Sequence, residues 1–250
     1  MSWIRRILGG QPEASAVPGQ EPRERPVLSP DDPRIGAGRV ALDRFWQGIG
    51  TAAPELLEPD HDPELTGPLS WPGRRETYRA VSRDGGLILA TDGLSDPFIG
   101  KSVAEESGFG VELFLDLPGA GDLSLADLRH HWAFELLTLV ARNVAGFGGI
   151  TDRLDRQGTV LMAMPLERDP GSAWRDSGGY ATVLIGLPAR GLGLTLSLPF
   201  GPVRIVPVTL LRPEEATVAL RGDEQRRDLA ARLLASGNGH RTDLARPALI

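Results

Sequence analysis

The sequence predicts an α+β fold, in which a mixed and mostly antiparallel sheet packs against one long central helix and a C-terminal helix. Short apolar segments with the period-two alternation of strands recur on both sides of one long amphipathic segment. Strands and helices do not alternate strictly, as they would in a parallel βαβ protein. The 250 residues, 41% of them apolar and 24% charged, are enough to form a substantial core.

The first half of the chain contains the clearest local signal, a β-hairpin. Strands are predicted at residues 76–82 and 86–91, because two strand-like segments flank the turn sequence Arg83-Asp84-Gly85. A helix is predicted at 40–49, where large apolar residues lie roughly on one face, and a further strand is predicted at 111–115.

One continuous helix is predicted from Ser124 to Val144. Ser124 is a favourable N-cap, and Asp127 stands three residues later in the capping-box position. Apolar residues then recur at helical spacing until Gly146 ends the pattern. The glycine-rich stretch 146–149 follows this helix instead of opening one, so it predicts a C-cap and turn and not a phosphate-binding loop.

The second half is predicted to be rich in strands, with two helices after them. The strands are expected at residues 159–164, 180–187, 192–198 and 203–211. Pro213 and the two acids after it are typical of a helix start. An amphipathic helix follows at 223–235, ended by Gly237.

The expected domain organisation has three parts. Residues 1–38 are rich in Pro, Gly, Glu and Arg and are expected to form a disordered or weakly amphipathic N-terminal leader. Residues 39–220 form the folded domain, and residues 221–250 contain the C-terminal helix and a loose tail. The two arginines and apolar residues of Met1–Leu8 leave a peripheral membrane adaptor open as an alternative function.

Composition excludes several classes of function. A net charge of −6 argues against binding to a nucleic-acid backbone, which needs concentrated positive charge. The absence of cysteine excludes disulfides, thiolate catalysis and cysteine-ligated zinc. No run of 18 apolar residues exists, so no integral membrane segment is expected, and the start lacks the apolar region of a secretory signal. We expect a cytoplasmic protein without a cofactor.

The histidines do not predict a metal site. His130 and His131 are adjacent, so on a helix they point in directions about 100° apart and do not form an i, i+4 ligand pair. His61 lies between Asp60 and Asp62 in a proline-rich loop with no further ligands nearby in sequence. We therefore predict no metal ligands.

The stretch TDGLSDPF, residues 91–98, gathers two acids and a hydroxyl. Ser95 follows the first glycine of a G-x-S-x-G pattern, but Pro97 stands at the second glycine position, and no helix opens there. A turn between strands also selects Asp and Ser for local backbone hydrogen bonds. A small serine-type hydrolase, using Ser95 with Asp92 or Asp96 and a distant histidine such as His130, stays open as an alternative.

Glu112 interrupts an otherwise apolar strand. Alternation places its side chain on the face opposite to those of Val111 and Leu113. The simplest interpretation is a solvent-facing residue, and the alternative is a partner-binding or buried, ion-paired carboxylate.

Three ordered segments together resemble the suppressor-of-fused domain family. They are GLSDPF (93–98), SGFGVELFLDL (107–117) and HHWAFELLTLVARNV (130–144). The resemblance rests on a GLS turn, a glycine-flanked aromatic before a strand of Glu-Leu type, and a helix with Trp132 and an Ala141-Arg142 step. These features extend over about fifty residues, and the chain resembles a bacterial member with one lobe instead of two.

The resemblance implies a non-enzymatic domain that binds another protein. Animal relatives hold a peptide segment as an added strand, a mode in which backbone hydrogen bonds supply affinity. Bacterial relatives are associated with toxin–immunity systems, which suggests an immunity protein whose acidic charge suits a basic toxin. The residues that we predict at the recognition surface are Asp92, Ser95, Asp96, Phe98 and Glu112.

Overall fold

The computed structural model describes residues 27–59, 71–100, 106–189, 191–193 and 195–250. It confirms the α+β class with a mixed, mostly antiparallel sheet of eight strands. The strands are β1 (Thr51–Ala52), β2 (Tyr78–Arg83), β3 (Gly86–Thr91), β4 (Val111–Pro118), β5 (Val160–Pro165), β6 (Tyr180–Ile185), β7 (Thr195–Leu198) and β8 (Gly201–Leu211). The described α-helices are α1 (Pro33–Gln47), α3 (Leu125–Arg129), α4 (Trp132–Phe147), α5 (Ile150–Gln157), α6 (Pro213–Ala219) and α7 (Asp223–Ala235).

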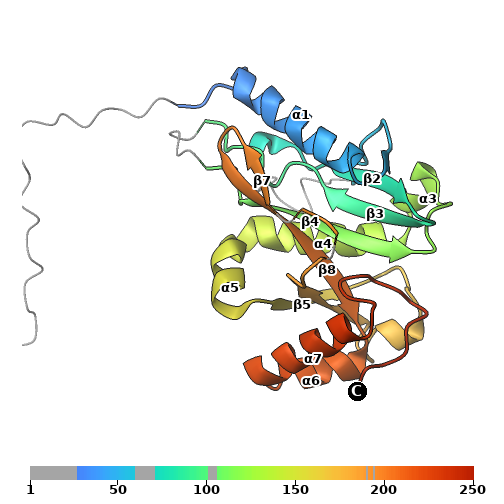
Figure 1. The fold of residues 1–250 in the computed structure, drawn as a ribbon. Coiled ribbons are helices and arrows are strands. Elements are labelled where there is room, and N and C mark those ends of the chain that lie inside the picture. Colours follow the sequence, from blue (N-terminus) through green and yellow to red (C-terminus); the bar gives the residue numbers. More distant parts are fainter. Residues whose placement is uncertain (1–26, 60–70, 101–105, 190, 194) are drawn as a thin grey trace, which may run out of the picture.

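The sheet consists of two parts that share β8. Strands β1 to β4 form an antiparallel meander, and β4 then pairs in parallel with β8. On its other side, β8 pairs with β7 through its first residues and with β6 through its last ones. β5 pairs with β6, so the order across the sheet is β1-β2-β3-β4-β8-β6-β5. The long β8 crosses the whole molecule in Figure 1.

Helices cover both faces of the meander. Leu87 and Leu89 of β3 belong to a large apolar cluster with α4, whereas Ile88 and Ala90 belong to a second cluster with α1. This separation follows from the alternation of side chains along a strand. Every residue of β3 is therefore buried, and Figure 1 shows the strand between α1 and α4. The predicted central helix corresponds to α4.

The predicted hairpin is confirmed. Arg83 pairs with Gly86, which leaves Asp84 and Gly85 as a two-residue turn. Their φ angles are +42° and +73°, and positive φ at both central positions is the signature of a type I′ turn. The strands predicted from alternation in the second half all occur, with ends shifted by a few residues.

The helix predicted from Ser124 to Val144 is not continuous. Ser124 does cap α3, accepting a hydrogen bond from the Asp127 amide at 3.2 Å. The chain then adopts an extended conformation at His131, whose Nδ1 accepts from the Ala133 amide and caps α4 anew. The periodicity of the apolar residues did not reveal this break, because α3 and α4 contribute to the same apolar cluster.

Helix α5 was not predicted. Gly148 and Gly149 have φ angles of +64° and +63°, which end α4 and turn the chain into a helix bent by 98° from it. The turn itself was predicted, but only Ile150 and Leu154 of α5 are buried, too few to give a helical pattern. In the described part of the chain no single helix is long and apolar enough to span a membrane; α4 and α5 pass that test only together.

The two ends of the folded part differ from expectation. Helix α1 begins at Pro33, capped by Asp32, so it starts inside the predicted leader. The segment after α7 was expected to be loose, but His240, Thr242 and Arg246 are buried. A helix cap holds the first end and contacts of single polar residues hold the second. Such contacts leave no periodic pattern of apolar residues in the sequence. Residues 1–26, including the proposed amphipathic Met1–Leu8, lie outside the described residues.

Candidate functional site

The GLSD turn, Gly93 to Asp96, connects the end of β3 to the segment before β4. Gly93 adopts a φ of +143°, which turns the chain so that the amides of Gly93 and Ser95 both point at Glu112. The Leu94 side chain is fully buried, and its carbonyl accepts a hydrogen bond from the Phe109 amide at 2.9 Å. The turn is therefore fastened to the GFG segment that precedes β4.

Glu112 is the centre of the site. Its Oε1 accepts hydrogen bonds from the amides of Gly93 (3.1 Å) and Ser95 (2.9 Å) and from the Ser95 hydroxyl (2.6 Å). Its Oε2 accepts from the Thr91 hydroxyl. The side chain is 0% exposed, so the preferred interpretation of a solvent-facing residue is wrong. Alternation does place Glu112 opposite Val111, but a helix from far upstream in the sequence covers that face.

Burial of Glu112 has an electrostatic consequence. Removal from water raises the pKa of its carboxyl from 4.5 to about 7, and the nearby Asp92 charge adds to the rise. The hydrogen bonds from Ser95 and Thr91 favour the ionised form but do not outweigh burial. The group is therefore poised to change its charge near neutral pH.

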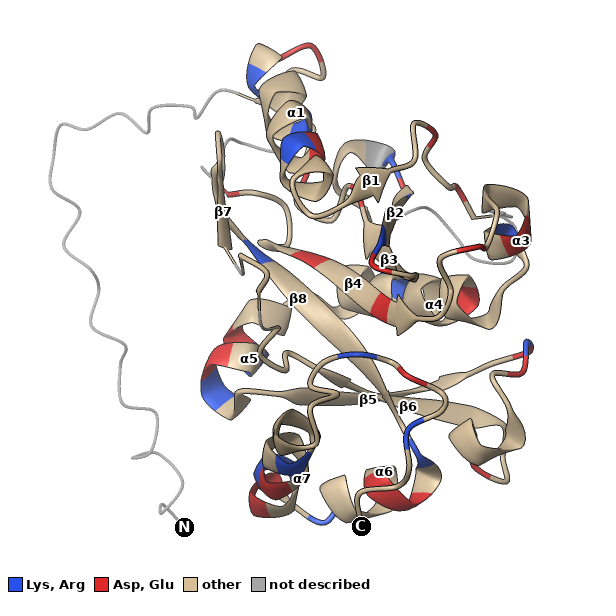
Figure 2. Cartoon of the chain, turned by 45° about the vertical axis from the view of Figure 1, so that its right-hand side comes forward, with Lys and Arg blue, Asp and Glu red and all other residues tan. Residues whose placement is uncertain are grey.

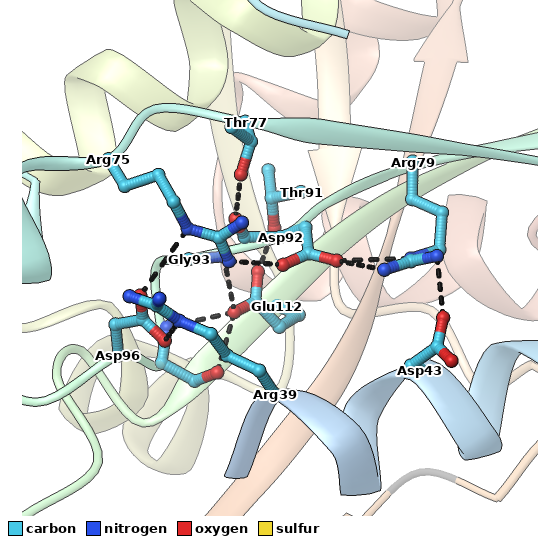
Figure 3. A network of polar contacts seen from close by, with 11 residues as sticks. Arg39, Asp43, Arg75, Thr77, Arg79, Thr91, Asp92, Gly93, Asp96 and Glu112 are labelled. Carbon is cyan, nitrogen blue, oxygen red and sulfur yellow. Dashed lines mark hydrogen bonds and ion pairs between the residues drawn. The ribbon is translucent and has the colours of Figure 1, made fainter. Parts of the chain in front are cut away.

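An ion-pair network surrounds this carboxyl (Figure 3). Asp92 binds Arg75 through Oδ1 at 2.6 Å and Arg79 through Oδ2 at 2.8 Å. Asp96 binds Arg39 at 2.7 Å and lies 3.7 Å from Arg75.

Helix α1 contributes the remaining two residues of the network. It supplies Arg39, and it also supplies Asp43, which binds Arg79 at 2.7 Å. The three arginines and the three aspartates balance one another in charge. The hydrogen-bond partners of Glu112 are hydroxyl and amide groups instead, so no cation among the described residues is paired with its charge.

The predicted site residues fall into two groups. The structure brings Asp92, Ser95, Asp96 and Glu112 together in one buried network. Phe98 is half-buried and packs edge-on against Phe109, with ring centroids 5.2 Å apart.

Phe109, but not Phe98, lines a groove of about 220 Å³. We call it the GFG groove, and it is lined by Glu106, Ser107, Gly108, Phe109, Gly110, Thr151, Phe200, Gly201 and Pro202.

Sequence reasoning missed the basic half of the network. Arg75, Thr77 and Arg79 alternate with period two on the approach to β2 and along it, and this alternation was an available signal for one polar strand face. Arg39 and Asp43 gave no such signal. They stand four residues apart on α1, a spacing that is equally common on a solvated helix surface.

The serine-hydrolase geometry is not present in the described residues. The Ser95 hydroxyl donates to Glu112, and no histidine there forms a hydrogen bond with it, as activation of a nucleophile requires. His131 caps α4, and His240 pairs with Asp116. Nor do described His, Asp or Glu residues form a group of three able to hold a metal ion. The candidate Asp60-His61-Asp62 lies outside the described residues.

Gly108 provides a test of how tightly the turn and the GFG segment fit. A Cβ at this position would meet the carbonyl oxygens of Leu94 and Asp96 well inside van der Waals contact, and its φ is +49°. We expect Gly108→Ala to lower the free energy of unfolding by about 2 kcal/mol. Gly119 has a φ of +76° with open space around it, so Gly119→Ala isolates the cost of φ alone. Chemical denaturation measures the free energy of unfolding of both variants. Equal losses of stability would contradict a close fit between Gly108 and the GLSD turn.

Two comparisons with known proteins found matches. A family model described as suppressor of fused protein (SUFU) matches residues 78–247. Among solved structures, a chain of the Sufu–Fu complex crystal structure is 15% identical, with a TM-score of 0.47, covering 86% of this chain and 91% of that one. Suppressor of Fused from Drosophila is also 15% identical, with a TM-score of 0.47 and coverage of 92% and 54%. This chain thus spans about half of the Drosophila chain. No curated protein matches it.

Proposed function

Because this chain belongs to the suppressor of fused protein family, we propose that it is a non-enzymatic protein-binding domain that neutralises a toxin in the bacterial cytoplasm. The family match carries the proposal, since it includes the GLSD turn, the GFG segment and every strand except β1. Members of the family are in general non-enzymatic, and Sufu has been solved in complex with a protein partner, Fu. Our chain would act as a single-lobe member.

The GFG groove is our proposed contact surface for the partner. Gly108, Gly110 and Gly201 line it, and residues without side chains bring the main chain to the surface, as recognition of an extended peptide by backbone hydrogen bonds requires. Phe109 also lines it, and the Phe98 ring packs edge-on against the Phe109 ring. Aromatic side chains at the rim of such a groove are frequent anchors of protein interfaces.

The four buried residues have a different role in this proposal. Asp92, Ser95, Asp96 and Glu112 do not reach the surface, so they position the turn that presents Phe98. The net charge of −6 supports a basic partner, because complementary charge accelerates encounter and suppresses wrong partners.

The test is recovery of a partner and its dependence on Phe98. We expect a stable protein partner to remain bound when the chain is purified from its native host. We also expect co-expression of the chain to relieve the toxicity of that partner. Phe98→Ala should weaken binding by about tenfold or more. Tyr180→Ala is the matched control, because Tyr180 is an exposed aromatic residue of β6, whereas Phe98 packs against Phe109 of the groove lining. Thermal unfolding checks that both variants fold.

Two results would count against the proposal. Failure to recover any stable partner would remove the binding function. Equal weakening by Phe98→Ala and Tyr180→Ala would move the interface away from the GFG groove.

A further inference from the structure

The C-terminal segment, residues 239–249, lies where β4 and β8 part. The two strands are paired from Val111 to Phe114 of β4, but the last four residues of β8 pair on their other side with β6. Thr242 bridges the opening: its amide donates to the Asp116 carbonyl of β4 at 2.8 Å, and its hydroxyl accepts from the Leu210 amide of β8 at 3.1 Å. The segment therefore pairs with backbone groups of β4 and β8 that a neighbouring strand would otherwise pair with.

One buried carboxylate of this opening binds the segment near its start. The Nε2 atom of His240 lies 3.1 Å from Oδ2 of Asp116, and the imidazole ring packs edge-on against Phe114. Arg83 approaches the same carboxylate at 3.5 Å. The His240 carbonyl accepts from the Thr209 hydroxyl at 2.9 Å, which holds the backbone against β8.

A second buried carboxylate binds the segment six residues later. Glu215 of α6 is fully buried and receives two hydrogen bonds from Arg246, at 2.5 and 2.6 Å. The Arg246 guanidinium also stacks over the Trp174 ring at 4.9 Å, and Arg212 stacks over the same ring at 4.7 Å. The Leu249 amide donates to Glu215 as well, at 3.1 Å. Figure 2 shows the segment crossing in front of β8 and ending beside α6.

Polar contacts and a little apolar packing together hold this segment. His240, Thr242 and Arg246 are buried, and Leu244 and Leu249 are partly buried against two apolar clusters. The other residues from Arg241 to Ala248 are exposed, apart from the half-buried Asp243. A hydrogen bond contributes about 1 kcal/mol net, so such a segment opens more easily than a core strand. Gly237, just before the segment, and Gly239, its first residue, have φ angles of +83° and +61° and provide a glycine hinge.

Simple release of the segment would be costly. Glu215, which is fully buried, would lose Arg246, and Asp116 would lose His240 and keep Arg83 at 3.5 Å; removing the partner of a buried charge is strongly unfavourable. The opening therefore favours exchange for another cationic segment over an empty state.

We propose that the opening between β4 and β8 is an acceptor site for an extended basic segment of a partner protein, and that residues 239–249 are its resident occupant. The partner segment that fits carries a hydrogen-bonding side chain for Asp116, a hydroxyl residue two positions later and an arginine six positions later, as His240, Thr242 and Arg246 do here. This site is separate from the GFG groove. Its test uses only this chain's own residues, so its failure is distinguishable from failure of the proposed function.

The experiment separates the segment from the folded chain without removing it. A protease site is inserted between Gly237 and Asn238 of the full chain, and the purified, folded protein is cleaved there. A fluorescent synthetic peptide of residues 239–250 is then added, and its binding is followed by anisotropy. We expect saturable replacement of the cleaved segment and competition by unlabelled peptide.

Two arginine variants of the peptide test the chemistry of the site. Arg246→Ala should bind about 100-fold or more weakly, because it leaves Glu215 buried without its cation. Arg241→Ala is the matched control: Arg241 is about half exposed and lies 3.9 Å from Asp116, so we expect a change of about threefold or less. Equal affinities of the two variants would overturn the proposed acceptor chemistry.

Amide hydrogen exchange on the unmodified chain tests the proposal without depending on the folding of the cleaved protein. Residues 239–249 should exchange faster than β4 and β8, because the segment opens without global unfolding. Protection equal to that of β4 and β8, or peptide exchange only at temperatures where the whole protein unfolds, would show a permanent part of the core and overturn the proposal.

Discussion

Asp92→Asn is expected to lower the free energy of unfolding by about 3 kcal/mol. The substitution keeps the shape of the side chain but removes the charge that Arg75 and Arg79 share. Both guanidinium groups are mostly buried, so water does not replace the lost charge. Among the described residues, Arg75 keeps Asp96 at 3.7 Å and Arg79 keeps Asp43 at 2.7 Å. Denaturant unfolding followed by circular dichroism measures the change.

A matched substitution separates burial from charge. Asp228 pairs with Arg232 on α7 at 2.8 Å, with both side chains more than half exposed. Asp228→Asn should change stability by about 0.5 kcal/mol or less, because water screens such pairs. Similar small losses at both positions would show that the network under the GLSD turn is solvated and does not stabilise the fold.

Glu112→Gln is expected to change how stability depends on pH. Since folding raises the Glu112 pKa from 4.5 to about 7, the folded state holds this proton more tightly than the unfolded state. The contribution of Glu112 to stability is fully present below pH 4.5 and is lost as pH rises to about 7. At about 1.4 kcal/mol per pKa unit, the loss reaches about 3 kcal/mol.

The difference between variant and wild type isolates this one group. Glutamine resembles the protonated acid, so the two proteins should have similar stability near pH 4.5, whereas at pH 8 the variant should be more stable by about 3 kcal/mol. Glu55→Gln, at an exposed position, is the control and should change the free energy of unfolding little. Parallel pH profiles for Glu112→Gln and wild type would contradict the raised pKa.

Elements specified by neighbouring residues were predictable from the sequence. The Asp84-Gly85 turn requires positive φ at both positions, and few dipeptides adopt it readily, so the hairpin followed directly. Helix α7 was predicted at its observed bounds, between Asp223 and Ala235. In each case the signal and the structure that it determines lie within a few residues of one another.

Features decided by distant segments were not predictable in this way. The burial of Glu112 depends on α1, which covers its face of β4 from about seventy positions earlier, and no pattern around Glu112 encodes that cover. The same limit explains the packed C-terminal segment, whose partners Asp116 and Glu215 belong to other elements. The family resemblance did include the GLSD turn and Glu112 in one ordered set of segments, because it compares distant segments jointly.

The sharing of β8 between both parts of the sheet also constrains the order of events during synthesis. Ser107, at the start of the β4 segment, bonds to Gly201 at the start of β8, 94 positions later. A ribosome therefore releases the whole β1–β4 meander, with an unpaired edge on β4, long before β8 exists to complete it. The nascent chain has to protect that edge for the time needed to synthesise the intervening residues, at about 5–20 residues per second. Mutations that slow translation within this interval should reduce the yield of folded protein without altering its final stability.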